Sequence, residues 1–283
     1  MYKIGIYGLG LIGGSMALAL KKSLGSPIFG SDKFNQKEAL QIGLMDAVLD
    51  EKNISEMDVI IIATPVDSIP KIALQVLDAM KLSALVFDVG STKHKIAKAI
   101  KNHPKRMNYV LAHPIAGTEY SGPQAAFSNL FEGKINIICD AQDTSEMQMK
   151  KAKNIFNKLK MKTIEMNSLA HDKHIAYVSH LSHISSFMLG KTVLDLEENE
   201  KNIFQMAGSG FASTVRLAKS SPQTWTPIFI ENKQNILIAL EEYIDNLNDF
   251  KKILYRENKQ KLENVLEKTN HIGEIINKIE AQK

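Results

Sequence analysis

Two polar segments directly follow short apolar runs in the first half of the chain. One contains Ser91 and reads Asp88-Val89-Gly90-Ser91-Thr92-Lys93, and the other reads His113-Pro114-Ile115-Ala116-Gly117-Thr118-Glu119. A histidine at the carboxyl end of a strand suits acid–base chemistry near neutral pH. A serine at a neighbouring strand end could hold that histidine or share a substrate hydroxyl. On spacing alone, a buried structural role for His113 is equally compatible.

A glycine-rich loop stands near the start of the chain. The apolar run Lys3–Tyr7 leads into Gly8-Leu9-Gly10-Leu11-Ile12-Gly13 and then into a helical stretch. In a strand–loop–helix unit the first glycine permits a tight turn, the second lets the backbone approach a pyrophosphate, and the third allows close helix–strand packing. The free N–H groups of the helix start attract the phosphates. We therefore predict cofactor contacts at Gly8, Gly10, Leu11, Ile12 and Gly13.

The choice of cofactor is indicated by Asp32, which closes the second apolar run about 20 residues later, where an acid meets the adenosine ribose. A carboxylate accepts hydrogen bonds from the ribose hydroxyls and repels a 2′-phosphate. Only Lys33 follows it, and no arginine. The sequence therefore favours NAD over NADP. Thr64 and Pro65, at the end of another apolar run, are predicted as a second cofactor contact.

Arginine is scarce among the 35 basic residues, and only Arg106, Arg216 and Arg256 occur. An arginine grips a carboxylate with two parallel hydrogen bonds, which a lysine does not do. Arg216 is therefore a candidate for carboxylate binding. We interpret Arg106 and Arg256 as side chains that cover apolar surface.

Four histidines, His171, His174, His180 and His183, fall within one short segment. Pairs spaced by three residues could share a helix face, so a metal site is conceivable. Because no cysteine lies nearby, we predict that no metal is bound.

The elements that position these residues follow from the hydrophobic pattern. Apolar runs alternate with helical patterns up to about residue 166, which predicts right-handed βαβ units in a doubly wound sheet of the α/β class. The expected strands are Lys3–Tyr7, Pro27–Gly30, Asp58–Ala63, Ala84–Asp88, Tyr109–Ala112, Ile135–Cys139 and Lys162–Glu165. The expected helices are Ser15–Lys22, Lys37–Ile42, Ser68–Met80, Lys93–Asn102 and Ser145–Leu159.

The rest of the chain is predicted to be all helical. A heptad-like apolar seam is formed by Ile236, Leu240, Tyr243, Leu247, Phe250 and Leu254. Such a seam needs a covering helix, either within the same domain or in a symmetric homodimer.

Composition excludes several classes of protein. Hydrophobic residues make up 44% and charged residues 23%, as in ordinary globular proteins. The net charge of +4 is small and the lysines are scattered, so we expect no nucleic-acid partner. No run of about 18 apolar residues predicts a membrane span. Cys139 is the only cysteine, which excludes an intrachain disulfide and favours a cytoplasmic location.

Taken together, these motifs resemble the prephenate dehydrogenases of tyrosine biosynthesis. The residues that carry the resemblance are GLGLIGGS at 8–15, DVGSTK at 88–93, HPIAGTEYSG at 113–122, SHLSH at 179–183, Gly208-Ser209-Gly210-Phe211, Arg216, Trp225 and Phe229-Ile230-Glu231-Asn232. Their order also agrees. The resemblance implies an NAD-binding Rossmann domain at 1–167, a helical substrate and dimerisation domain at 168–283, and an active site between them.

The resemblance also implies roles for single residues. His113 would accept the proton of the prephenate ring hydroxyl, with Ser91 assisting, while NAD receives a hydride and CO2 leaves. Arg216 would bind a substrate carboxylate. The resemblance places Thr118 and Glu119 at the pocket, the latter as a partner of the arginine, and places His180 and His183 at its wall, donating to the substrate or fixing neighbours. His171 and His174 would be structural or surface groups.

One position departs from the family pattern, since Ser213 stands where relatives often carry an acid. Arogenate, the amino analogue of prephenate, remains an alternative substrate. A generic hydroxyacid or imine reductase is less favoured, because it would lack the HPIAGTE segment. A non-catalytic NAD-sensing regulator would need a DNA-binding helix pair or a basic patch, and neither is evident.

Overall fold

The structure is a computed structural model that describes residues 1–197 and 202–281. It contains two compact units, Met1–Lys233 and Gln234–Lys283. The first unit is built on one eight-stranded sheet with the order β3-β2-β1-β4-β5-β6-β7-β8. The strands are β1 Ile4–Tyr7, β2 Ile28–Ser31, β3 Ala47–Val48, β4 Val59–Ile62, β5 Leu85–Asp88, β6 Tyr109–Pro114, β7 Ile135–Cys139 and β8 Lys162–Met166.

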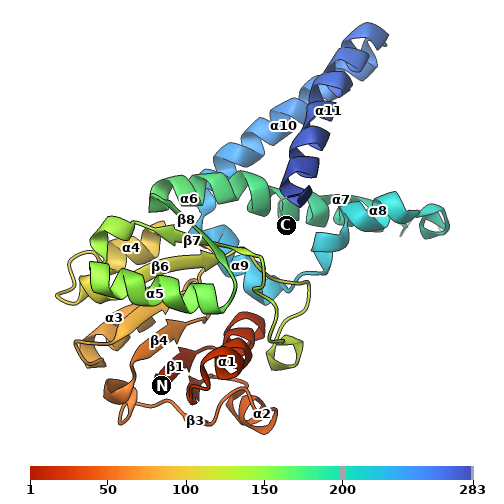
Figure 1. Cartoon of the computed structure of the whole chain (residues 1–283). Coiled ribbons are helices and arrows are strands. Elements are labelled where there is room, and N and C mark those ends of the chain that lie inside the picture. The colour runs from red at the N-terminus through yellow and green to blue at the C-terminus, as the bar shows by residue number, and fades with distance from the viewer. Residues whose placement is uncertain (198–201, 282–283) are drawn as a thin grey trace. The chain divides into compact units, whose positions relative to one another are not determined.

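Helices cover both faces of this sheet (Figure 1). They are α1 Leu11–Leu24, α2 Gln36–Gln41, α3 Ile69–Ala79, α4 His94–Ile100 and α5 Glu146–Lys158. Alternate residues of the strands point to opposite faces. Strand β4 illustrates this, because Ile61 joins the core beneath α1 and α5, whereas Ile60 joins the core beneath α3 and α4. The predicted doubly wound α/β sheet is confirmed, and its central strand β4 is apolar throughout because both of its faces are buried.

Three local expectations need correction. Strand β7 runs antiparallel to β6, whereas the other neighbouring strands are parallel. The connection at 115–134 holds only a short 3₁₀ turn, and a parallel crossover normally requires a helix. Helix α1 begins at Leu11, four residues before the expected Ser15, and the two-residue strand β3 was not predicted.

Arg106 is also placed differently from its predicted position over apolar surface. It is 7% exposed, its guanidinium donates to the carbonyl oxygen of Tyr109 at 2.8 Å, and it lies 3.5 Å from a carboxylate oxygen of Asp143. Burial lowers the pKa of Arg106, and the charge of Asp143 opposes that shift. This arginine joins the start of β6 to the segment that precedes α5.

The helices that follow β8 complete the first unit. They are α6 Ser168–Ile175, a π-helical segment Ala176–His180, α7 Leu181–Glu197, α8 Ser209–Thr214 and α9 Pro222–Glu231, with short 3₁₀ turns at Ile203–Met206 and Arg216–Lys219. The side chain of Asn167 caps α6 by accepting from the backbone N–H of Leu169 at 2.9 Å. Ile228 of α9 belongs to the same apolar core as α3 and α4. Helix α9 is therefore packed against the sheet domain, and α6 is joined to it by the bonds from the backbone N–H groups of Lys93 and His94 to Asp172.

The second unit consists of α10 Lys233–Tyr255, apart from its first residue, and α11 Lys259–Ala281. The predicted seam lies on α10, and its last three members, Leu247, Phe250 and Leu254, are 51%, 37% and 51% exposed. Helix α11 likewise exposes apolar side chains, including Ile272 and Ile276. Within the described residues, no helix has the length and apolar character that a membrane span requires.

Candidate active site

The glycine loop leaves β1 at the carboxyl edge of the sheet and enters α1. Gly8 has a φ of +85°, and a Cβ there would lie 2.5 Å from the carbonyl oxygen of Ala63. A Cβ on Gly13 would lie 1.9 Å from the carbonyl oxygen of Gly8. Side chains are therefore excluded at both positions, which lets α1 start directly against the strands.

The start of α1 is shaped to receive an anionic group. Gly10 is the N-cap residue and offers no side chain to the first turn, and a Cβ at this position would meet no atom within 4 Å. The backbone N–H groups of Leu11, Ile12 and Gly13 precede the first intrahelical bond, which Gly14 donates to Gly10 at 2.8 Å. Open space in front of free N–H groups fits the pyrophosphate of a dinucleotide.

Asp32 directly follows β2 and anchors the glycine loop. Its Oδ2 accepts from the backbone N–H of Leu9 at 2.8 Å, and its Oδ1 accepts from the N–H of Asn35 at 2.7 Å. Thr64 follows β4, and its hydroxyl accepts from Ser68 at 2.8 Å, while Pro65 beside it is exposed. The predicted cofactor residues therefore share the carboxyl edge of neighbouring strands, where ligands of open α/β sheets bind.

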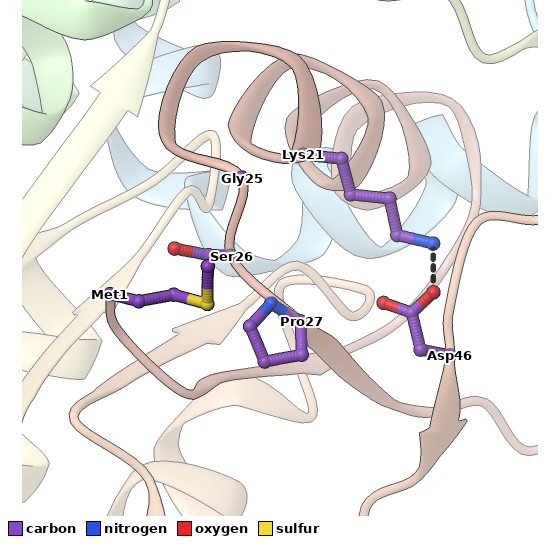
Figure 2. A pocket seen from close by; sticks show the side chains of 6 residues that line it. All are labelled: Met1, Lys21, Gly25, Ser26, Pro27 and Asp46. Atoms are coloured by element: carbon purple, nitrogen blue, oxygen red, sulfur yellow. Dashed lines mark hydrogen bonds and ion pairs between the residues drawn. The ribbon is translucent and has the colours of Figure 1, made fainter.

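A hollow of about 350 Å³ lies at the opposite edge of the sheet (Figure 2). It is lined by Met1, Lys21, Gly25, Ser26, Pro27 and Asp46, with Lys21 and Asp46 joined at 2.8 Å. Met1 precedes β1 and Pro27 precedes β2, so this hollow sits at the amino ends of the strands. It is therefore separate from the residues that sequence patterns assign to cofactor and substrate.

His113 lies near the carboxyl end of β6 and is 9% exposed. Its Nδ1 lies 2.8 Å from Nε2 of His171, and Nδ1 of His171 lies 2.8 Å from Oδ1 of Asp172. The two rings meet edge to face at a centroid distance of 5.0 Å. Burial holds the pKa of His113 well below its usual value of 6.5, and nearby His171, Lys93 and His180 lower it further. His113 is therefore neutral at neutral pH, as a base must be before it accepts a proton.

The segment after β5 carries Ser91 and a buried ion pair. Ser91 is half-buried, and its hydroxyl makes no hydrogen bond to any side chain or backbone group that the structure describes. Lys93 is fully buried, pairs with Asp88 and donates to the carbonyl oxygen of Ala112 at 2.7 Å. Because Ala112 precedes His113, this pair fixes the end of β6 from the neighbouring strand.

His180 is 1% exposed and is held by Asn232. The Asn232 amide nitrogen lies 3.2 Å from Nδ1 of His180 and donates to the carbonyl oxygen of Asp172 at 2.7 Å. An amide nitrogen only donates, so Nδ1 of His180 accepts and the ring carries its proton on Nε2. Burial lowers the pKa of His180 to about 4, against the opposing charge of Asp172.

His183 lies one turn further along, on α7. Its Nδ1 lies 3.0 Å from the carbonyl oxygen of Ser179, and its ring stacks on Trp225 at a centroid distance of 3.4 Å. A carbonyl only accepts, so Nδ1 of His183 carries a proton, and Nε2 of the neutral ring is an acceptor. Burial lowers the pKa of His183, and the nearby charge of Arg216 adds to the shift. His183 therefore donates from Nε2 only when it is protonated.

The remaining predicted substrate residues lie on more open segments. Arg216 is exposed at the start of its 3₁₀ turn, and Ser213 is exposed on α8. Thr118 is exposed, and its hydroxyl accepts from the backbone N–H of Tyr120 at 3.2 Å. Within residues 1–197 and 202–281, Glu119 and Arg216 form no ion pair with each other or with another side chain. In the same ranges no group of three histidine, cysteine, aspartate or glutamate side chains could hold a metal ion.

Family models match most of this chain. Residues 16–165 match the nucleotide-binding domain of prephenate dehydrogenase, and residues 167–268 match its dimerization domain. The chain belongs to the prephenate dehydrogenase family. Its sequence is 33% identical over 266 residues to the prephenate dehydrogenase of Bacillus subtilis, covering 90% of this chain and 71% of that protein.

Two solved structures of similar dehydrogenases extend this finding to the fold. The prephenate dehydrogenase of A. aeolicus, solved in complex with hydroxyphenyl propionate and NAD+, has a TM-score of 0.89 and 30% identity, with 98% of each chain covered. The arogenate dehydrogenase of Synechocystis has a TM-score of 0.78 and 26% identity, covering 97% of this chain and 99% of that one.

Within this member of the prephenate dehydrogenase family, sequence reasoning missed several residues around His113. The predicted structural or surface role leaves open that His174 is exposed, whereas His171 is 1% exposed and contacts His113. Asp172 and Lys93 are not among the predicted site residues. The only local signal for them was the adjacency of an acid to His171 and the lysine at the end of DVGSTK.

Proposed function

We propose that this protein catalyses the NAD-dependent oxidative decarboxylation of prephenate to 4-hydroxyphenylpyruvate in tyrosine biosynthesis. The observation that carries the proposal is the state of His113, a neutral and nearly buried base at the carboxyl edge of a sheet whose glycine loop fits a dinucleotide. The family, the fold and the similar enzyme solved with NAD+ support the same function.

The cofactor is proposed to be held by the glycine loop and Asp32. The free N–H groups of Leu11, Ile12 and Gly13 would bind the pyrophosphate, and the Asp32 carboxylate would accept from the ribose hydroxyls. When bound, NAD supplies the acceptor for the hydride that leaves ring carbon C4 of the substrate. Thr64 and Pro65 would line the same edge of the sheet.

His113 is proposed to handle the single proton that the reaction moves. The substrate hydroxyl would donate its proton to His113 as the C4 carbonyl forms. Loss of CO2 leaves the ring as a phenolate, and His113 returns the proton to its oxygen. No net proton is released, so the protein needs one base that can hold a proton briefly. Ser91, on the neighbouring strand end, would share the hydroxyl.

Prephenate carries two carboxylates, and Arg216 is proposed to bind one of them. It is exposed and unpaired with acids of the described chain, so its guanidinium is available to a ligand. The Arg216 charge also lowers the pKa of His183, which indicates that the two groups lie near each other. His180, being almost fully buried, is proposed to fix its neighbours, while His183, Thr118 and Glu119 would face the substrate.

The protein is proposed to act as a homodimer through its helical domain, with the domain division at 1–167 and 168–283. The supporting observation is the apolar surface that α10 and α11 expose on a single chain. The matched dimerization domain covers α10 and the first part of α11.

The deciding experiment measures the absorbance of the reduced cofactor with prephenate and with arogenate, each with NAD and with NADP. We expect the highest kcat/KM for prephenate with NAD. His113→Asn should lower kcat about 10²–10⁴-fold with little change in KM, because the proton moves only in the transition state. The control is His174→Asn, which changes an exposed histidine. A higher kcat/KM for arogenate would assign the alternative substrate, and full activity of His113→Asn would refute the proposed base.

A further inference from the structure

His113, His171 and Asp172 form a continuous row of hydrogen bonds that reaches from the sheet into α6. The two links are both 2.8 Å, from Nδ1 of His113 to Nε2 of His171, and from Nδ1 of His171 to a carboxylate oxygen of Asp172. All three side chains are buried. The row joins residues that lie 58 positions apart in the sequence.

The acid end of this row determines where each proton lies. Oδ1 of Asp172 accepts from the backbone N–H of Lys93 at 2.7 Å, and Oδ2 accepts from the N–H of His94 at 2.9 Å. Both oxygens therefore act as acceptors, so Nδ1 of His171 must carry the proton it shares with Asp172.

The position of the proton on His171 in turn determines the tautomer of His113. With a proton on Nδ1, neutral His171 has a lone pair on Nε2 and accepts there. Nδ1 of His113 must donate to it, which leaves the lone pair of His113 on Nε2. The row thus selects the tautomer of His113 in which Nε2 is the base.

We propose that His171 and Asp172 are positioning residues for the reaction, which hold His113 in its Nδ1–H tautomer and take over the proton that His113 receives. This inference rests on the proposed function, in which His113 accepts the substrate hydroxyl proton. It adds a two-histidine relay to that function.

The relay balances without any further reactant. The substrate O–H bond breaks and an N–H bond forms at Nε2 of His113. The proton on Nδ1 of His113 moves to Nε2 of His171, so the positive charge comes to lie on His171 beside the Asp172 carboxylate. Both transfers reverse when His113 returns a proton to the phenolate oxygen. The imidazolium then lies next to the Asp172 carboxylate and not in an apolar environment, which lowers the free-energy cost of placing a positive charge inside the protein.

The groups that surround the row explain why a positive charge on His113 is unfavourable. The facing titratable groups are Lys93 from the segment before α4, Asp88 as its partner on β5, His180 from the π-helical segment, and Cys139 on β7. Lys93 and His180 oppose a positive charge on His113, and burial opposes it more strongly. Within the row, the Asp172 carboxylate lies next to the imidazole of His171. The row therefore places a carboxylate beside His171 and none beside His113.

Kinetics of two variants separate positioning from proton uptake. In His171→Gln, the amide oxygen can still accept from Nδ1 of His113 but takes no proton. His171→Leu removes both functions. We expect kcat to fall about 10-fold in His171→Gln and about 100-fold or more in His171→Leu, with KM for prephenate nearly unchanged. The control is His174→Gln, an exposed histidine on the same helix, which should keep the original kcat.

The pH profile tests the relay itself. Without His171 to take up the charge next to Asp172, His113 becomes a weaker base, so the acidic limb of kcat should move to lower pH by about one unit in His171→Gln. If His171→Gln keeps both the original kcat and the original limb, proton uptake by His171 is excluded. Circular dichroism and urea unfolding show whether His171→Leu is folded; if it is not, the His171→Gln profile decides.

A spectroscopic measurement separates this inference from the proposed substrate. Nitrogen-15 labelling of histidine with long-range proton–nitrogen correlation reports the tautomer of each ring in the free protein, and His113 is assigned by its loss in His113→Asn. We expect the Nδ1–H tautomer for His113. If this tautomer is present but prephenate is not turned over, the proposed function is wrong and the row stands. If His113 carries its proton on Nε2, the inference is overturned whatever the substrate.

Discussion

Replacing Asp32 with asparagine tests the proposed cofactor site most directly, because this carboxylate serves both the loop and the cofactor. In the structure its Oδ2 accepts from Leu9 in the glycine loop, and its Oδ1 accepts from Phe34 and Asn35. Asparagine has one oxygen where aspartate has two, so Asp32→Asn directs an NH2 group at a backbone N–H on one side. We expect a loss of about 1–2 kcal/mol in the free energy of unfolding.

The loss in cofactor affinity should be larger than this effect on stability. A hydrogen bond from a ribose hydroxyl to a charged acceptor contributes about 1.5–3 kcal/mol. Its removal corresponds to an increase of about 10- to 100-fold in the Kd of NAD. NADP should lose less affinity than NAD, because the repulsion between the carboxylate and a 2′-phosphate disappears as well.

The matched control is Asp46→Asn, at the other edge of the same sheet. Oδ2 of Asp46 also accepts a backbone N–H, from Ile28 at 2.8 Å, and its other oxygen pairs with Lys21. The Asp46 side chain is 50% exposed, so solvent screening limits the expected stability loss to at most about 1 kcal/mol. Its Kd for NAD should not change.

Isothermal titration calorimetry gives the Kd of NAD and NADP for both variants, and urea titration gives the free energy of unfolding. The comparison removes general destabilisation as an explanation for weaker binding. If Asp32→Asn binds NAD as tightly as the unmodified protein, or if Asp46→Asn weakens NAD equally, the proposed contact between Asp32 and the ribose is wrong.

Three further predictions concern substrate binding, assembly and acid stability. Arg216→Ala should raise KM for prephenate strongly and lower kcat less, because the substitution removes about 2–4 kcal/mol of binding free energy from the substrate carboxylate. An unchanged KM in steady-state kinetics would show that Arg216 does not bind the carboxylate. Glutamates at Leu240 and Leu247 together should convert the dimer into monomers or unfold the helical half, as measured by light scattering, and a dimer of unchanged mass would show that the seam is an internal core. His180 should make the protein less stable in acid, because the unfolded chain binds a proton at pH 6.5 while the folded chain does so only near pH 4. Stability is therefore complete above pH 6.5 and falls towards pH 4 by about 3 kcal/mol from this group, and equal urea midpoints at pH 7 and pH 4.5 would contradict the burial of a neutral His180.

The kind of fold was predictable because its determinants are local. Continuous apolar runs such as that of β4 indicate strands buried on both faces, and the glycine spacing constrains a loop whose neighbours lie next to it in the chain. The direction of β7 was not predictable from its own residues. It depends on whether the segment 115–134 forms a crossover helix, and the pairing of His113 with Ile137 follows from that connection.

The candidate site likewise contains residues that the sequence identifies and residues that only the tertiary structure brings together. Ser91, His113 and Arg216 were identified by residue type, position after an apolar run or scarcity, which are properties of the sequence alone. The contact between His113 and His171 depends on the docking of α6, which is held by the bonds from the backbone N–H groups of Lys93 and His94 to Asp172. Hydrogen bonds between residues 58 positions apart are made by packing and not by local spacing, so only the tertiary structure could place His171 and Asp172 behind the base.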